Sequence, residues 1–72
     1  MKFSDKLIFL RKRRGLTQQE LAKLINVSQG SIWQYESGRT SPPKNTQIQI
    51  AKALNVKLAD LSNDEKDLSL ED

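Results

Sequence analysis

The sequence contains no cysteine and no histidine. Without thiols and imidazoles the chain cannot form disulfides or Cys/His zinc sites, and it has no histidine to act as a general base. Catalysis would have to rest on carboxylates, and residues 1–59 contain no paired acidic cluster. We therefore expect neither enzymatic activity nor a bound metal or cofactor.

Long apolar runs are also absent. No stretch approaches the roughly 18 apolar residues that a membrane span needs, and the apolar run Leu7–Leu10 is too short for the core of a signal peptide. These absences predict a cytoplasmic protein that does not associate with membranes. A length of 72 residues suffices for one small domain. Strand-like alternation, internal repeats and low-complexity segments are missing too, so we expect helices.

Acidic residues are scarce over most of the chain. Residues 1–59 hold eleven Lys or Arg and three Asp or Glu, a net charge of +8, whereas residues 60–72 hold one Lys and six acidic residues, a net charge of −5. A basic domain with an acidic tail indicates a polyanionic partner for the domain. Ordinary surface charge that keeps the protein in solution is the alternative. We expect a folded domain over residues 1–62 and an acidic, flexible tail over residues 63–72.

Residues 17–38 have the pattern of two short helices joined by a tight turn. Thr17 with Glu20 forms a capping box, and Ser28 is the expected N-cap of the second helix. Asn26 lies in the turn and Gly38 follows the second helix, and both residue types tolerate the left-handed region. The apolar positions predict one buried face on each helix: Leu21, Leu24, Ile25, Val27, Ile32 and Tyr35.

Three further helices are expected outside this stretch. One should cover residues 5–14, with Ser4 as its N-cap and Gly15 as its stop. A second should cover residues 46–54, with Asn45 or Thr46 as its N-cap and Asn55 just after its end, and a third should cover residues 58–62. Short loops between five helices predict an all-α fold, a compact orthogonal bundle.

The outward face of the second helix of the pair carries neutral side chains. Its members are Gln29, Ser31, Trp33, Gln34 and Ser37. An ordinary solvated face would use Lys and Glu, whereas Gln and Ser beside basic flanks suit hydrogen bonds to base edges in the DNA major groove. Gln in particular can bond bidentately to adenine N6 and N7.

The same stretch resembles the helix-turn-helix of the phage Cro/repressor family, also called the XRE family. The resemblance covers about residues 5–62 and rests on many positions at fixed spacing. They are Leu10-Arg11, Arg14 to Gln18, Glu20 to Ala22, Val27 to Gln29, Ile32, Gln34, Glu36, Gly38, Leu54 and Val56. Two positions depart from the pattern: Asn26 stands where the family usually has Gly, and Gly30 stands where it often has a base-contacting side chain.

The resemblance implies a lambda-repressor-like bundle whose second helix-turn-helix element enters the major groove. Residues at base-reading positions are Gln29 and Gln34, with Ser31 and Trp33 as further candidates. Residues expected to contact the DNA backbone are Thr17, Gln18, Ser28, Ser37, Arg39 and Lys44. The resemblance also implies an ion pair between Arg11 and Glu36.

Some of these residues have a second interpretation. Trp33 could pack on thymine methyls or sugars, or it could cover the first helix of the pair or the following loop as peripheral packing. The loop with Arg39 and Lys44 could be a simple connector. The basic residues Lys12, Arg13 and Arg14 could contact phosphate, or merely complement the negative end of their helix.

Two functions remain open at this point. The first is a transcriptional regulator, a repressor, that binds a double-stranded DNA operator sequence-specifically and forms a homodimer at least on DNA. Val56, Leu58 and Leu61 would contribute to the two-fold interface. The alternative is a protein-interaction module that keeps the helix-turn-helix fold without binding DNA, with Trp33, Leu68 and Leu70 as its anchors.

Overall fold

The computed structural model describes residues 1–62, which form five α-helices. They are α1 (Phe3–Arg13), α2 (Gln18–Ile25), α3 (Gln29–Ser37), α4 (Lys44–Leu54) and α5 (Leu58–Ser62). No strand occurs in this part of the chain, so the expected five-helix, all-α fold is confirmed. The tail from residue 63 onward, including Leu68 and Leu70, lies outside the described residues.

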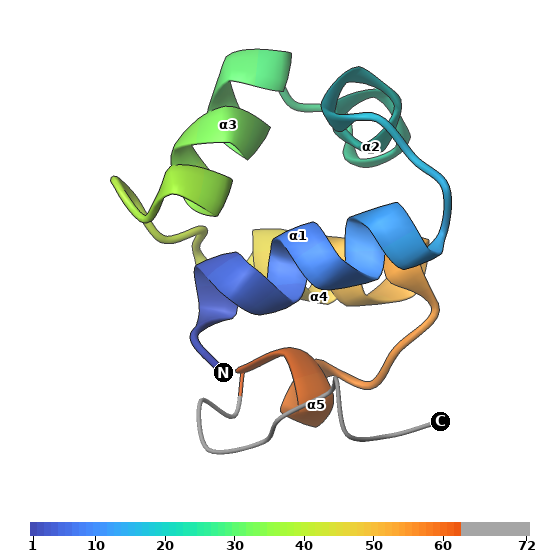
Figure 1. Ribbon diagram of the computed structural model, residues 1–72, viewed down its shortest axis with the longest axis vertical. Helices are drawn as coiled ribbons and strands as arrows, with labels where there is room; N and C mark the ends of the chain where they lie inside the picture. The colour runs from blue at the N-terminus through green and yellow to red at the C-terminus, as the bar shows by residue number, and fades with distance from the viewer. Residues whose placement is uncertain (63–72) are drawn as a thin grey trace.

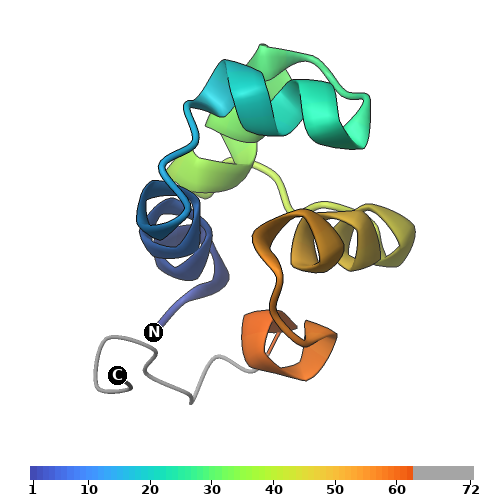
Figure 2. The ribbon, with the colours of Figure 1, turned by 90° about the vertical axis from the view of Figure 1, so that its right-hand side faces the viewer.

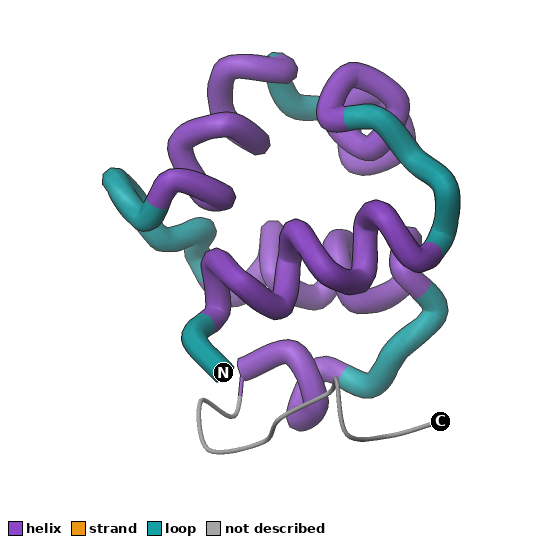
Figure 3. Tube along the Cα trace, in the orientation of Figure 1, coloured by secondary structure: helices purple, strands orange, loops and turns teal. Residues whose placement is uncertain are grey.

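The helices are arranged in layers. Figure 1 shows α2 and α3 at one end, α1 and α4 across the middle, and α5 at the other end, and the view in Figure 2 agrees. Accordingly, α1 packs against α3 and α5, while α4 packs against α2 and α5. Short connections join consecutive helices (Figure 3). The helix pair α2–α3 is therefore presented at the end of the molecule remote from α5.

The helix-turn-helix pair is capped as predicted. Thr17 Oγ1 accepts from the Glu20 backbone N–H at 3.0 Å, and Glu20 Oε1 accepts from the Thr17 N–H at 2.8 Å. Ser28 Oγ accepts from the Ser31 N–H at 3.1 Å. Asn26 (φ 61°) ends α2 and Gly38 (φ 79°) ends α3, both in the left-handed region. Local signals alone therefore fix the ends of both helices.

The starts of α1 and α4 differ from the predictions. The cap of α1 is Lys2, whose carbonyl accepts from the Lys6 N–H at 2.9 Å, so the prediction of Ser4 as N-cap was wrong. Phe3 packs against the core and extends the helix to include it. The predicted caps Asn45 and Thr46 were also wrong, because both lie inside α4.

Two consecutive prolines set the start of α4. Pro43 disfavours helical geometry at Pro42, and Pro43 is itself extended (φ −63°, ψ 163°), so Pro43 is the N-cap and the helix begins at Lys44. The Pro43 carbonyl accepts from the Gln47 N–H at 2.9 Å, and Gln47 Nε2 donates to the Pro42 carbonyl at 3.0 Å. Asn55 (φ 59°) ends the helix as predicted.

One apolar core joins all five helices. It consists of Leu7, Leu10, Leu21, Ala22, Ile25, Ile32, Ile50, Ala51, Leu54 and Leu61. Leu24, predicted to lie on the buried face of α2, is instead 62% exposed. At 100° per residue it projects about 100° from the centre of the face formed by Leu21, Ala22 and Ile25. Leu61 is fully buried within the monomer, so it is not available for the dimer interface predicted from sequence.

Two charged residues, Lys6 and Glu36, are buried with this core. Glu36 is paired, as described below. The Nζ of Lys6 has no hydrogen-bond partner among the described residues. None of the helices described here is long and apolar enough to cross a membrane.

Candidate nucleic-acid interface

The N-termini of α2 and α3 meet at the helix-turn-helix end of the molecule. Gln18 and Gln29, each the first residue of its helix, are hydrogen-bonded at 2.6 Å from Gln29 Nε2 to Gln18 Oε1. A shallow hollow beside them is lined by Arg11, Thr17, Gln18, Gln19 and Gln29. Backbone N–H groups at a helix N-terminus favour an anion, so this junction has the polarity that a phosphate requires.

An ion pair ties this junction to α1. Arg11 Nε lies 2.5 Å from Glu36 Oε2, and Arg11 Nη2 donates to Glu36 Oε1 at 3.1 Å. The side chains are only 11% and 5% exposed. Arg11 Nη1 also donates to the Leu16 carbonyl at 2.7 Å, in the loop that leads to α2. The expected Arg11–Glu36 pair is thus formed, and it links α1, the loop and α3.

Hydrogen bonds link the ion pair to the two glutamines. Gln18 Nε2 donates to Glu36 Oε1 at 3.0 Å, and Gln18 Oε1 then accepts from Gln29 Nε2. Arg11 can only donate and an ionised Glu36 can only accept, so each amide in turn has one allowed orientation. A buried charge therefore fixes the direction of every hydrogen bond out to the exposed Gln29.

This orientation of the two amides leaves specific hydrogen-bonding groups without a partner in the chain of hydrogen bonds. The Nε2 of Gln29 has two hydrogens and gives one to Gln18, so Gln29 keeps one N–H donor and its Oε1 acceptor. Gln18 likewise keeps one N–H after donating to Glu36. A donor and an acceptor on one amide are what bidentate contact with adenine needs.

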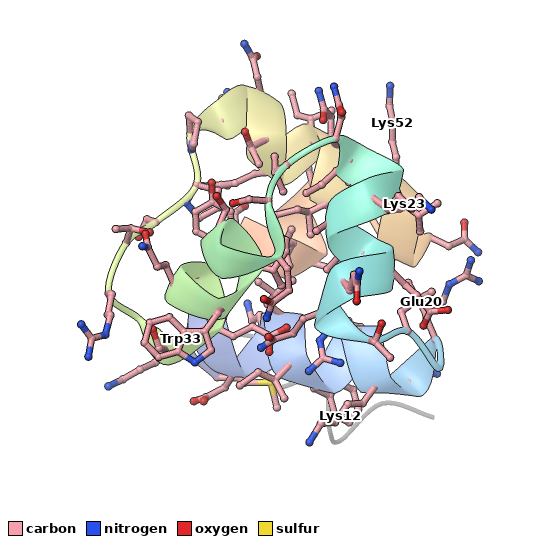
Figure 4. All side chains as sticks on the ribbon, turned by 90° about the horizontal axis from the view of Figure 1, so that it is seen from above. Lys12, Glu20, Lys23, Trp33 and Lys52 are labelled. Atoms are coloured by element: carbon pink, nitrogen blue, oxygen red, sulfur yellow. The ribbon has the colours of Figure 1, made fainter. Side chains whose placement is uncertain are left out.

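Trp33 lies on the outer side of α3. Figure 4 shows it on the opposite side of the molecule from Lys23 and Lys52. The guanidinium of Arg39 lies 5.0 Å from the centre of its ring, within cation–π range, while 45% of the residue stays exposed. Trp33 therefore contacts the following loop and still presents a free surface, so both interpretations made from sequence stay open.

The other predicted residues fall into two groups. Thr17, Ser28 and Ser31 lie near the junction, where Thr17 and Ser28 are caps and the Ser31 hydroxyl is 2.9 Å from that of Ser28. Ser31 is half-buried, which limits its reach. Gln34 and Ser37 lie toward the end of α3, Arg39 lies in the loop after it, and all three are exposed. Lys44, predicted to lie in that loop, is instead the exposed first residue of α4. Ser37 Oγ donates to the Gln34 carbonyl at 3.1 Å.

The link between Gln18 and Gln29 was not predicted from sequence. Each glutamine directly follows a capping residue, which places both at helix N-termini, but the caps do not set the angle between α2 and α3 that brings the two side chains together. Gly30, which follows Gln29, is exposed, and a side chain there would first meet Ser28 Oγ at 3.9 Å. Packing therefore does not require a glycine at position 30.

Comparison with known proteins gives consistent matches. Residues 7–61 match the family model described as Helix-turn-helix. Repressor protein C of Escherichia phage P2 is 40% identical over 47 residues, which are 65% of this chain and 48% of that protein. The cryptic phage CTXphi transcriptional repressor RstR of Vibrio cholerae is 39% identical over 62 residues, which are 86% of this chain and 56% of that protein. The chain thus spans about half the length of these relatives.

Solved structures show the same architecture. The P22 c2 repressor in complex with a synthetic operator superposes with a TM-score of 0.83 at 25% identity, covering 88% of this chain and 96% of that one. A transcriptional regulator from Listeria innocua superposes with a TM-score of 0.80 at 30% identity, covering 97% and 69%. The chain belongs to the helix-turn-helix family, in its phage Cro/repressor (XRE) type.

Proposed function

We propose that this protein is a transcriptional regulator, a repressor, that binds double-stranded operator DNA sequence-specifically with α3 in the major groove. The single observation that carries the proposal is the hydrogen-bonded chain from the half-buried Arg11 through buried Glu36 and Gln18 to exposed Gln29. It gives the first residue of α3 a fixed pattern of one acceptor and one donor. A neutral, oriented amide at the start of an exposed helix has no evident role in stability, but it suits a base edge.

In the proposed complex, Gln29 reads a base pair and adenine is its best match. Gln34, one turn and a half further along α3, contacts a neighbouring position, with Ser31 and Trp33 at the margins of the contact. The half-exposed indole of Trp33 suits a thymine methyl or a sugar. Such contacts near the N-terminus of a recognition helix set sequence preference.

The backbone contacts come from the groups around these readers. The free N–H of Gln18 and the N-terminal amides of α2 face one phosphate, with the capping hydroxyls of Thr17 and Ser28 beside them. Ser37, Arg39 and Lys44 contact the backbone at the other end of α3. Contacts of this kind fix the register of the protein on the duplex and carry no sequence information themselves.

The protein acts as a homodimer on DNA in this proposal. Val56 and Leu58 are half-buried at the end of the molecule remote from α3 and contribute to a two-fold contact, without Leu61. Operator half-sites should then lie about 10 bp apart, centre to centre, or a multiple of that distance. Support for repression comes from relatives named as phage repressors.

The salt dependence of DNA binding tests the proposal. With about four phosphate contacts per subunit, the dimer should show a slope of log affinity against log salt of roughly −7. Lys44→Ala should weaken binding to all sequences alike and reduce the slope by about one per subunit. The matched control is Lys52→Ala, an exposed lysine of α4 on the side of the molecule opposite Trp33 (Figure 4), which should leave the slope unchanged. An affinity that does not change with salt would exclude DNA as the partner.

A further inference from the structure

Leu24 is the most exposed large apolar side chain among the described residues, at 62%. Two shallow hollows meet at it, one reaching Leu16 before α2 and the other reaching Ala53 of α4. We call the surface formed by Leu16, Leu24 and Ala53 the Leu24 shelf. Nothing in the proposed DNA complex uses this apolar surface.

The rim of the Leu24 shelf is basic. Lys23 and Lys52 belong to the last turns of α2 and α4 and line the hollows on either side of Leu24. Figure 4 shows both lysines on the same edge of the molecule. Glu20 lines the hollow on the Leu16 side and keeps its negative charge although its Oε1 accepts from the Thr17 N–H, so the two lysines leave the rim with a net charge of +1. The shelf therefore fits an apolar segment flanked by carboxylates.

We propose that the acidic segment 67–72 of the same chain docks on the Leu24 shelf. Its sequence, Asp-Leu-Ser-Leu-Glu-Asp, places Leu68 and Leu70 two residues apart. In an extended segment such residues point to the same side about 7 Å apart, so both leucines can face the shelf. Asp67, Glu71 and Asp72 flank the leucines and complement Lys23 and Lys52.

The tail is long enough to reach the shelf. Leu70 follows Ser62, the last residue of α5, by eight positions, and eight extended residues span about 26–29 Å. The Ala53 side of the shelf lies on α4, which packs directly against α5, so the tail need not span the 30 Å long axis of the molecule. A tethered segment also binds at an effective concentration of about millimolar, so a shallow apolar surface suffices to hold it.

The docked segment would leave α3 uncovered, because the shelf lies on α2 and α4 and Trp33 of α3 is on the other side (Figure 4). The inference does not depend on DNA binding. Leu24→Ser should therefore change DNA affinity less than about twofold. An experiment that disproves tail docking therefore leaves the proposed DNA binding untouched, and the reverse also holds.

Disulfide trapping tests the docking directly, because the chain has no cysteine of its own. The test variant carries Leu24→Cys with Leu70→Cys, and the control carries Trp33→Cys with Leu70→Cys. Trp33 is the other exposed large apolar residue within residues 1–62, so random encounters with a tail that has no docking site would serve both pairs alike. In a glutathione redox buffer, the intramolecular disulfide should form at least about tenfold more favourably in the test variant.

Added charge reversal, Lys23→Glu with Lys52→Glu, should remove most of that preference, whereas Lys12→Glu should not. Equal trapping at Leu24 and Trp33 would overturn the proposal, since the tail would then have no preferred position. Preferential trapping at Trp33 would overturn it in favour of a tail over the recognition face. Covalent dimers in place of the intramolecular product would show docking on a second copy and would also contradict it.

Discussion

Arg11 and Lys6 are basic residues of the same helix, and their surroundings are opposite. The guanidinium of Arg11 donates three hydrogen bonds, two to Glu36 and one to the Leu16 carbonyl. Lys6 is fully buried, and its ammonium has no hydrogen-bond partner in the described part of the chain. Burial of a polar group costs free energy unless its hydrogen bonds are replaced, so the two cations affect the fold in different ways.

The difference shows how a buried charge can orient side chains on a binding surface. Arg11 is paired with Glu36, whose carboxylate can only accept hydrogen bonds. The ion pair therefore determines the orientation of the Gln18 amide and then of the Gln29 amide. Within residues 1–62, Lys6 has no such partner and orients no other side chain. We infer that the Arg11–Glu36 pair is required for presentation of α3, whereas the charge of Lys6 is dispensable.

Removal of one member of the pair should have the largest effect. Glu36→Ala leaves the guanidinium of Arg11 nearly buried without its carboxylate, which should cost about 3–5 kcal/mol in the free energy of unfolding. A domain of this size has a stability of only about 5 kcal/mol, so the variant should be close to unfolded in a denaturant titration. The neighbouring control Ser37→Ala should stay within about 0.5 kcal/mol of the wild type.

A double substitution separates stability from presentation. Arg11→Met with Glu36→Leu replaces the pair by apolar side chains of similar volume and should recover much of the lost stability. Sequence preference on DNA should not recover, because Gln18 has then lost the acceptor that orients it. A double-mutant-cycle coupling energy below about 0.5 kcal/mol would mean that the pair contributes no more than an exposed one.

Lys6→Met should have a smaller effect of the opposite sign. Methionine follows the shape of the lysine stem without an ammonium to bury, so the free energy of unfolding should rise by about 1–3 kcal/mol. Lys12→Met, an exposed position on the same helix, should change it by less than about 0.5 kcal/mol. A loss of stability in Lys6→Met would show that the ammonium is paired in solution, and the contrast with Arg11 would fail.

Much of the fold could be predicted because its signals are local. A capping box, a left-handed Asn or Gly and the spacing of apolar residues act within one or two turns, and they located α2, α3, α5 and the ends of α1 and α4. The predicted starts of α1 and α4 were wrong for tertiary or backbone reasons. Packing of Phe3 draws the first turn of α1 inward, and the Pro42-Pro43 geometry overrides the preference of Asn45 for a cap.

The site was predictable in part. The Arg11–Glu36 pair came from the family resemblance, since nothing local relates two residues 25 positions apart. The exposure of Leu24 depends on which side of α2 the other helices cover, and periodicity gives only the width of that side. The Gln18–Gln29 bond depends on the angle between α2 and α3, which the caps do not determine.

Base preference measured on randomised DNA tests the central claim most directly, for the wild type, Gln29→Ala and Gln18→Ala. We predict that Gln29→Ala weakens binding to the preferred site by about 1–3 kcal/mol and relaxes preference at one base pair. Gln18→Ala should reduce discrimination at that same base pair, because Gln29 remains but loses its orientation. Unchanged preference in Gln29→Ala, or a change in Gln18→Ala confined to a different base pair, would contradict the claim that a buried ion pair orients the reader of the DNA.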